Sequence, residues 1–217
     1  AEAIPGAIRI LESFDEDCVS GFIANYFTSQ SVGQVTNCTL VGEGGDELFG
    51  GYFAEFPELS AEQRAELAED LVRIAYNTGL RRLDRGWLAN SVEYRTPFLD
   101  PAVIAFAKKI PNEAKYYQEE PAHRGVEKWI LREAFKGELP EEIRTRTKMR
   151  FARGVGIDDV MDEVTADFVT EEQLRETPQT AAGVTLHSRK ELHYYRMFRS
   201  QFPEGYESLT ARWDPFK

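Results

Sequence analysis

An acidic, glycine-rich segment at residues 41–52, with the sequence VGEGGDELFGGY, restricts the folds open to this chain more than any other feature. It places five glycines among three carboxylates, directly after residues 36–41, whose apolar and β-branched side chains predict a short buried strand. Glycine adopts positive φ without steric cost and lets a ligand approach the backbone. Because open α/β sheets bind ligands at the carboxyl ends of their strands, the segment predicts a ligand-binding loop.

The carboxylates of this loop predict a site for a metal ion and a nucleotide. Glu43 and Asp46 lie three residues apart and could face one ion, and Mg²⁺ typically takes one or two protein carboxylates while water and phosphates fill its other positions. Gly42, Gly44 and Gly45 would let the phosphates approach. The alternative is a solvated turn, which the glycines alone would favour. The preceding strand and the clustered acids favour the binding site.

Composition limits the classes of protein to which the chain can belong. Its 217 residues fit one large domain or two small ones, and an apolar fraction of 42% is typical of a globular protein. No apolar run is long enough to cross a membrane, and the acidic start is unlike a signal peptide, so we expect a soluble, cytoplasmic protein. A net charge of −11 argues against nucleic acid as a partner. Cys18 and Cys38 are expected to be buried free thiols rather than a disulfide.

A basic segment at residues 144–153 stands out against this acidic background. It carries five positive charges and no acid, which predicts a local anion site. Lys148 is the strongest candidate in it, because a lysine ammonium acts as a compact point charge for phosphate. The alternative is a solvated face whose arginines pair with neighbouring acids.

Helical patterns predominate, with few strands, which predicts an α/β fold that is mainly helical. Capping boxes are expected at Ser13–Glu16 and at Ser60–Gln63, and Asp100 before Pro101 predicts another helix start. Further helices are expected at 126–136, closed by Gly137, at 160–168 and at 192–202. The first of the capped helices should bury one apolar face, made of Val19, Phe22, Ile23, Tyr26 and Phe27.

Residues 91–100, with the sequence SVEYRTPFLD, combine an acid and an arginine with a rigid proline turn. From the residues alone we expect a structural link in which Glu93 and Arg95 form a paired, partly buried couple. A catalytic role for either residue is the alternative.

Several motifs together resemble the synthetase domain of glutamine-hydrolysing asparagine synthetases. They occur in the order of that family across nearly the whole chain, and the combination is specific although each motif alone is not. The motifs are GEGGDELFGGY at 42–52, DR at 84–85 with 91–100, KWILREA at 128–134, LPEEI at 139–143, RTK at 146–148 with 151–156, and YYRMF at 194–198 with WDP at 213–215.

The resemblance implies a fold, a reaction and a set of roles. The fold would be the carboxyl-terminal part of an adenine-nucleotide α-hydrolase-like, pyrophosphate-loop domain, with residues 1–217 forming one partial domain. In the reaction, ATP adenylates the side-chain carboxylate of aspartate, pyrophosphate leaves, and ammonia attacks to give asparagine and AMP. Asp46 would bind Mg²⁺, Glu43 would lie near the acyl-adenylate and the ion, and Lys148 would neutralise pyrophosphate. Glu93 and Arg95 would support the pocket.

One part of the family pattern has no match. A phosphate loop of the form Ser-Gly-Gly-x-Asp-Ser-Ser is expected upstream, and residues 1–40 do not contain it. The amino-terminal glutaminase domain is missing as well. The chain is therefore expected to act with a second chain or segment that supplies these parts, and to be inactive by itself. Apolar surface left exposed in the first forty residues would also favour a homo-oligomer.

Two other functions stay open. A truncated paralogue could serve as an interaction or regulatory module without turnover, although the joint presence of Glu43, Asp46 and Lys148 favours the enzyme. A fragment of a β-lactam synthetase is the third option. In those enzymes a tyrosine tends to stand at the position of Glu43, so the glutamate favours the asparagine branch.

Overall fold

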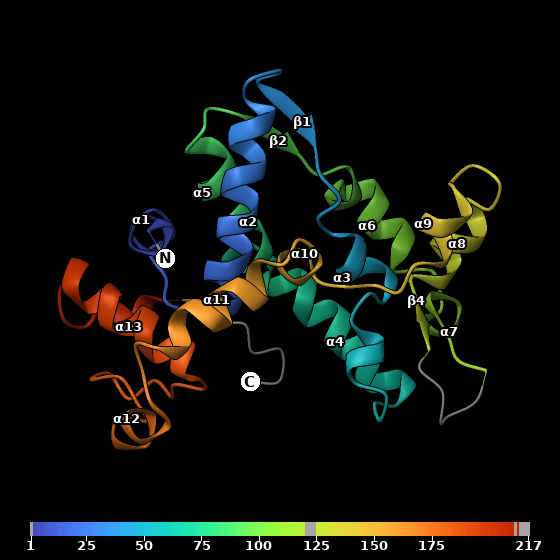
Figure 1. The fold of residues 1–217 in the computed structure, drawn as a ribbon. Coiled ribbons are helices and arrows are strands. Elements are labelled where there is room, and N and C mark those ends of the chain that lie inside the picture. Colours follow the sequence, from blue (N-terminus) through green and yellow to red (C-terminus); the bar gives the residue numbers. More distant parts are fainter. Residues whose placement is uncertain (1, 120–124, 211, 213–217) are drawn as a thin grey trace. The chain divides into compact units, whose positions relative to one another are not determined.

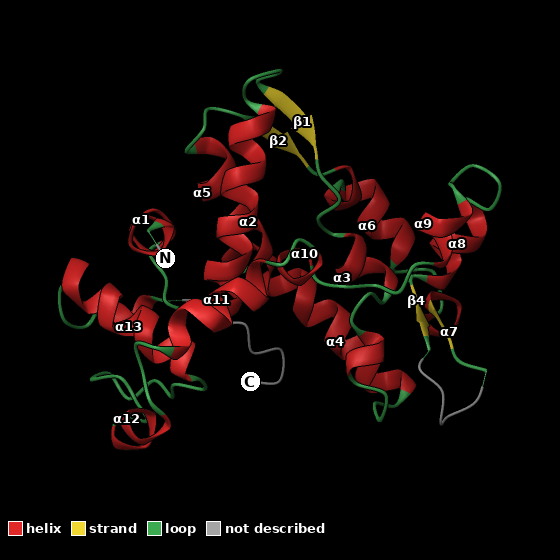
Figure 2. Ribbon diagram, viewed as in Figure 1, coloured by secondary structure: helices red, strands yellow, loops and turns green. Residues whose placement is uncertain are grey.

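The computed structural model describes residues 2–119, 125–210 and 212, and the sequence motif at 213–215 lies outside them. The expected mainly helical fold with few strands is confirmed (Figure 2). Contacts divide the chain into two compact units. Unit 1 comprises Ala1–Thr39, Tyr76–Tyr94 and Arg150–Asp214, and unit 2 comprises Leu40–Ala75, Arg95–Met149 and Pro215–Lys217. The assignment of residues 1–217 to a single family domain stays a prediction.

Unit 1 is built from helices around one apolar core. Its elements are α1 (Ala3–Leu11), α2 (Glu16–Val32), α5 (Gly79–Leu88), α10 (Phe151–Gly154), α11 (Ile157–Ala166), α12 (Glu171–Glu176), α13 (Arg189–Gln201) and the 3-10 turn η4 (Tyr206–Leu209) (Figure 1). The core joins Ile4 and Ile8 of α1, Phe22 of α2 and Tyr194 and Phe198 of α13, all at most 1% exposed. Segments far apart in sequence therefore share this core.

The helix α2 differs from its prediction at both its start and its apolar face. Its N-cap is Asp15, whose Oδ1 accepts the Cys18 N–H at 2.8 Å, while Ser13 Oγ accepts only the Asp15 N–H. The capping box at Ser13 is therefore wrong, because a carboxylate nearer the helix takes its place. Along the face, Phe22 is buried as expected, whereas Phe27 is 47% exposed near the helix end.

The expected strand at 36–41 forms as β1 (Cys38–Leu40), which pairs with β2 (Glu93–Arg95). The Glu93 N–H donates to the Asn37 carbonyl and the Val41 N–H donates to the Arg95 carbonyl, so both strands advance in the same direction. The expectation of a buried strand is wrong, because Leu40 is 70% exposed. Among the described residues only two strands form this sheet, which leaves part of β1 uncovered.

Unit 2 holds the glycine-rich loop and shorter elements. These are α3 (Gly45–Phe49), η1 (Phe53–Glu55), α4 (Ala61–Ile74), η3 (Pro97–Leu99), α6 (Pro101–Ala107), α7 (Asn112–Lys115), β3 (Tyr116–Tyr117), β4 (Val126–Glu127), α8 (Trp129–Ala134) and α9 (Glu141–Thr145). A further 3-10 turn, η2 (Ala75–Asn77), spans the boundary between the units. The capping box at Ser60 and the Asp100 cap are both confirmed.

The expected helix at 126–136 begins later than its apolar pattern predicts. Val126 and Glu127 pair with Tyr117 and Tyr116 in an antiparallel ladder, and Lys128 has the left-handed backbone (φ 54°) that turns the chain into α8. Strand pairing therefore overrides helix propensity over the first two residues. In the described part of the chain, no helix is both long and apolar enough to cross a membrane.

Candidate active site

The glycine-rich loop places Asp46 in the first turn of α3. Gly44 caps this helix with φ +93°, and its carbonyl accepts the Leu48 N–H at 3.0 Å. The helix ends at Phe49, its C-cap Gly50 has φ +73°, and the Gly51 N–H returns to the Asp46 carbonyl at 2.8 Å. Because L side chains rarely adopt these two φ values, the glycines fix a five-residue helix directly after β1.

The glycines of the loop differ in what surrounds them. A Cβ at Gly44 would lie 2.6 Å from Leu99 Cγ, and one at Gly45 would lie 3.3 Å from the Phe98 ring, so both glycines serve packing. Gly42 is exposed, and a Cβ there would meet nothing within 4 Å. Of the three glycines predicted to bind the cofactor, Gly42 therefore has the open backbone that a ligand could approach.

Two lysines converge on the Asp46 carboxylate. Lys128 Nζ lies 3.0 Å from Asp46 Oδ1, and Lys148 Nζ lies 4.0 Å from the same oxygen. Lys148 also lies 3.6 Å from Glu55 Oε1 and 4.2 Å from the centre of the Tyr52 ring, a cation–π distance. The sequence predictions of Asp46 and Lys148 thus meet at one site, which we call the lysine–aspartate cluster (Asp46, Lys128, Lys148, Glu55 and Tyr52).

The cluster contains a deeply placed cation. The Lys148 side chain is only 6% exposed, whereas the Lys128 and Asp46 side chains are each 29% exposed. Lys148 Nζ and Asp46 Oδ1 are buried atoms that make no hydrogen bond of good geometry with the described residues. The two ammonium groups balance two carboxylates here, so a multiply charged anion could replace the carboxylates as their partner.

Sequence analysis did not single out Lys128, Tyr52 or Glu55 as members of the site. Lys128 reaches Asp46 only because β4 ends and the chain reverses at its left-handed backbone, which the helical pattern did not predict. Their positions in the sequence could have indicated them. Tyr52 is the last residue of the glycine-rich segment, Glu55 follows three residues later, and Lys128 is the first residue of the KWILREA motif.

The other predicted site residues, Glu43, Glu93 and Arg95, are not members of the lysine–aspartate cluster. Glu43 is half-buried in the loop. Glu93 and Arg95 are both exposed on β2, while Tyr94 between them is half-buried, so the expectation that the two charges are partly buried is wrong. Their pairing with each other stays a prediction. Alternation along the strand puts both charges on its open face. Roles for Glu43, Glu93 and Arg95 in the reaction stay predictions.

The basic segment at 144–153 does not act as one anion site. Arg144 pairs with Glu133 at 2.8 Å and with Glu141 at 2.7 Å, and Arg150 pairs with Asp17 at 2.8 Å. These two arginines form ion pairs with acids, as the alternative prediction expected. Of the basic residues in this segment, Lys148 is the one that lies in the lysine–aspartate cluster.

A metal ion was predicted on Asp46 and Glu43. Among the described residues, no group of three or more His, Cys, Asp or Glu side chains is arranged to hold one. Mg²⁺ bound with phosphates needs fewer protein ligands, and Asp46 Oδ1 accepts no hydrogen bond of good geometry from the residues that the structure describes. The donor chemistry of Asp46 therefore fits such an ion when a phosphate ligand accompanies it.

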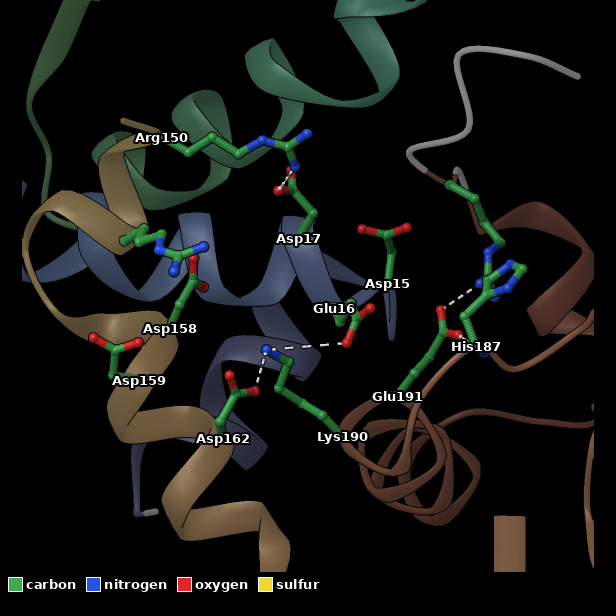
Figure 3. A pocket seen from close by; sticks show the side chains of 12 residues that line it. Asp15, Glu16, Asp17, Arg150, Asp158, Asp159, Asp162, His187, Lys190 and Glu191 are labelled. Atoms are coloured by element: carbon green, nitrogen blue, oxygen red, sulfur yellow. Dashed lines mark hydrogen bonds and ion pairs between the residues drawn. The ribbon is translucent and has the colours of Figure 1, made fainter. Parts of the chain in front are cut away.

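Unit 1 contains a cavity of about 510 Å³ whose lining is strongly charged (Figure 3). Its acids outnumber its bases, and α2, α11 and α13 all contribute. The lining residues are Asp15, Glu16, Asp17, Arg150, Arg153, Asp158, Asp159, Asp162, His187, Lys190, Glu191 and Arg212. Most of the charge is paired internally, as where Lys190 Nζ contacts Asp162 at 2.7 Å and Glu16 at 3.9 Å.

Glu191 is the unusual group of this cavity. It is 1% exposed, and burial raises the pKa of its carboxyl to about 7, against the lowering effects of the His187 N–H and the Arg212 guanidinium. The His187 N–H donates to Glu191 Oε2 at 2.7 Å, and Arg212 pairs with Oε1. A carboxyl that titrates near neutral pH therefore lies in the wall of the cavity, and no sequence pattern had indicated it.

Comparisons with known proteins agree on one family. The sequence profile described as asparagine synthase matches residues 1–69 and 56–204. The chain is 32% identical over 231 residues to glutamine-hydrolyzing asparagine synthetase 1 of Saccharomyces cerevisiae, and 29% identical over 228 residues to the glutamine-hydrolyzing asparagine synthetase of Gallus gallus. Each alignment covers 99% of this chain and 39% of the relative, so the chain spans about two fifths of the length of these proteins.

Proposed function

Because the chain belongs to the asparagine synthase family, we propose that it forms part of an ATP-dependent ligase that makes asparagine from aspartate and ammonia. In this reaction an oxygen of the aspartate side chain attacks the α-phosphorus of ATP and pyrophosphate leaves. Ammonia then attacks the acyl carbon and AMP leaves. The lysine–aspartate cluster is the observation that carries the proposal, because it can hold the phosphates of such a reaction.

Lys148 is proposed to neutralise the departing pyrophosphate. Its ammonium has three N–H donors, is nearly excluded from water, and makes no hydrogen bond of good geometry with the described residues. An electrostatic contact strengthens when water is excluded, so charge that develops on a leaving oxygen would be stabilised strongly here. Lys128 would add a second, more exposed cation from the other side of Asp46.

Asp46 is proposed to hold Mg²⁺ together with the phosphates. When bound, the ion would neutralise phosphate charge, as it does in many phosphoryl-transfer sites. Asp46 would then exchange its lysine partners for the ion, and both lysines would turn to phosphate oxygens. The exposed backbone of Gly42 and the half-buried Glu43 would lie on the nucleotide or acyl-adenylate side, as the family resemblance implies.

The proposal includes a larger assembly. The 217 residues contain no Ser-Gly-Gly-x-Asp-Ser-Ser loop, so we expect a further segment or a partner chain to supply the phosphate loop and the glutaminase domain. The fold would be the carboxyl-terminal part of a pyrophosphate-loop domain, which the parallel pair β1–β2 and the glycine loop after β1 support. A pull-down from the native source should recover such a partner unless one polypeptide carries all parts.

The residue roles are tested by Asp46→Asn in the assembled enzyme. We expect Mg²⁺-dependent pyrophosphate release to fall by at least 100-fold, on the order of 3 kcal/mol in transition-state stabilisation. Asp70→Asn is the matched control, because Asp70 is an exposed helix residue that pairs with Arg73 and should leave release unchanged. Normal release by the Asp46 variant would refute the assignment, and a chain that binds no nucleotide in any assembly would favour a non-catalytic paralogue.

A further inference from the structure

Tyr52 is the uncharged member of the lysine–aspartate cluster, and its ring lies against the buried ammonium. The centre of the ring is 4.2 Å from Lys148 Nζ, within the range of a cation–π contact. Tyr52 is 7% exposed and the Lys148 side chain is 6% exposed, so little water reaches either group. A cation–π contact is strongest where water is excluded. The ring therefore stabilises the ammonium at a place that hydration hardly reaches.

Two hydrogen bonds fix the position of this ring. The Tyr52 hydroxyl donates to Glu47 Oε1 at 3.3 Å, and Glu47 is a buried residue of α3, next to Asp46 in the sequence. The Tyr52 carbonyl accepts the Glu55 N–H at 3.0 Å, which holds the residue at the start of η1. The ring is thus attached both to the helix that carries Asp46 and to the turn that carries Glu55.

The Lys148 side chain has weaker anchors of its own. Its Nζ makes no hydrogen bond of good geometry with the described residues, although Glu55 Oε1 and Asp46 Oδ1 lie 3.6 and 4.0 Å away. A lysine side chain has many rotamers, and holding it in one of them costs conformational entropy. The two carboxylates attract the ammonium by charge, and the face of the Tyr52 ring is the surface against which it packs.

The ring also differs from the carboxylates in its effect on a phosphate. In the proposed reaction Asp46 turns to Mg²⁺, and a carboxylate such as Glu55 repels the same phosphate that Lys148 attracts. An aromatic ring presents the negative face of its quadrupole to the cation but carries no net charge. It can therefore keep its contact with the ammonium while phosphate binds on another side.

We propose that Tyr52 is a positioning residue for the ligase reaction, which acts through Lys148 by holding its ammonium toward the departing pyrophosphate. The inference rests on the proposed function, since it needs Lys148 to neutralise that leaving group. Such charge develops in the transition state. Loss of the ring should therefore slow the chemical step and leave the binding of ATP nearly unchanged.

The first test is the rate of pyrophosphate release by the assembled enzyme over a range of ATP concentrations. Tyr52→Leu should lower kcat about tenfold, with KM for ATP within about twofold. Tyr52→Phe keeps the ring and should restore kcat to within about threefold of the original enzyme. Tyr76→Leu is the matched control, because Tyr76 is a 67% exposed tyrosine outside the cluster, and its kcat should stay within about twofold.

A double-mutant cycle shows whether Tyr52 acts through Lys148. Lys148→Met should slow release on the order of 100-fold, and adding Tyr52→Leu to it should change the rate by less than about twofold. A tyrosine that only supports the fold would slow the Lys148→Met enzyme as much as it slows the original. Independent losses of this kind would overturn the inference.

A measurement on the original chain tests the contact itself, whether or not the variants fold. The face of an aromatic ring shifts nearby protons upfield, so NMR of lysines labelled at Cε should show the Lys148 protons upfield of those of exposed lysines. Absence of that shift overturns the inference. Normal kcat in Tyr52→Leu, or a Tyr52→Phe enzyme as slow as Tyr52→Leu, overturns it while the proposed function stands. Normal release by Lys148→Met refutes the proposed role of Lys148, and the inference with it.

Discussion

The Asp46 side chain leaves no room for a side chain at residue 51. A Cβ at Gly51 would lie 1.9 Å from Asp46 Oδ1 and 2.7 Å from the Asp46 Cα, so the α3 backbone itself would have to move. We expect Gly51→Ala to lower the free energy of unfolding by about 1–3 kcal/mol, as overpacking does, and to slow pyrophosphate release in the assembled enzyme. Urea denaturation and a pyrophosphate assay measure the two effects.

Gly42→Ala is the control for this substitution. It lies in the same loop, but its Cβ would meet nothing within 4 Å, so stability should change by less than about 0.5 kcal/mol. Equal losses in both variants would mean that the crowding at Asp46 does not determine the stability of the loop.

Glu191 predicts a pH dependence of folding. Its pKa is about 7 in the folded protein and near 4.5 in an exposed glutamate, so the folded state holds the proton more tightly. Its contribution to stability is fully present below about pH 4.5 and is lost as the pH rises through about 7, a change on the order of 3 kcal/mol. Glu191→Gln should remove this dependence, and urea unfolding at several pH values measures it.

The exposed Glu163 provides the comparison for Glu191. Its replacement by glutamine should leave the pH profile of stability parallel to that of the original chain. If the Glu191→Gln profile is parallel as well, the carboxyl does not titrate near neutral pH in the folded state.

At the residue scale, sequence reasoning found the groups that lie in compact motifs. Asp46 and Lys148 belong to dense local patterns, and the structure brings them within 4.0 Å. Glu191 was missed because its raised pKa comes from burial. No neighbour of Glu191 in the sequence reveals how little water reaches it.

At the scale of elements, the capping box of α4 is expected to contribute measurably to stability. Ser60 Oγ accepts the Gln63 N–H at 3.3 Å and Gln63 Oε1 accepts the Ser60 N–H at 2.9 Å. Ser60→Ala should cost about 1 kcal/mol in thermal denaturation, and Ser60→Asn should recover most of it. Ser31→Ala, an exposed serine late in α2, should have little effect, and an equal cost there would contradict the capping role.

Elements were predictable where local signals agreed. The caps at Ser60 and Asp100 and the helices α11 and α13 follow from residues inside a single turn or face. Predictions failed where contact with another segment decided the outcome. Val126 and Glu127 pair with β3 instead of beginning the expected helix, and no described segment packs over Leu40 of β1 to bury it. The expected apolar surface in the first forty residues does occur, at Phe27, Val35 and Leu40.

For the whole molecule, the two units are expected to differ in local stability. Most of the described buried apolar side chains belong to unit 1, where α1, α2 and α13 share one core. Hydrogen exchange followed by mass spectrometry should therefore show the slowest amides in these three helices, with faster exchange in α3, α6 and α8. Equally slow exchange in both sets would mean that the units open together.

The division into units also explains why the basic segment was misjudged. The boundary falls between Met149 and Arg150, so Lys148 belongs to unit 2 and Arg150 to unit 1. Arg150 pairs with Asp17, which lies 133 positions away in the sequence. A dense run of basic residues predicts that they will pair with anions. Which carboxylates they pair with depends on the contacts that folding makes between distant segments.

Two opposed requirements, the stability of the fold and the placement of an ammonium at Asp46, act on the residue at position 128. A non-glycine residue in the left-handed region costs about 1–2 kcal/mol, and glycine would avoid that cost, yet only a long basic side chain places an ammonium 3.0 Å from Asp46. Directed evolution for heat resistance alone should therefore enrich glycine at position 128, whereas selection for catalysis should retain lysine. The identity of this residue would thus report which pressure has dominated in a given lineage.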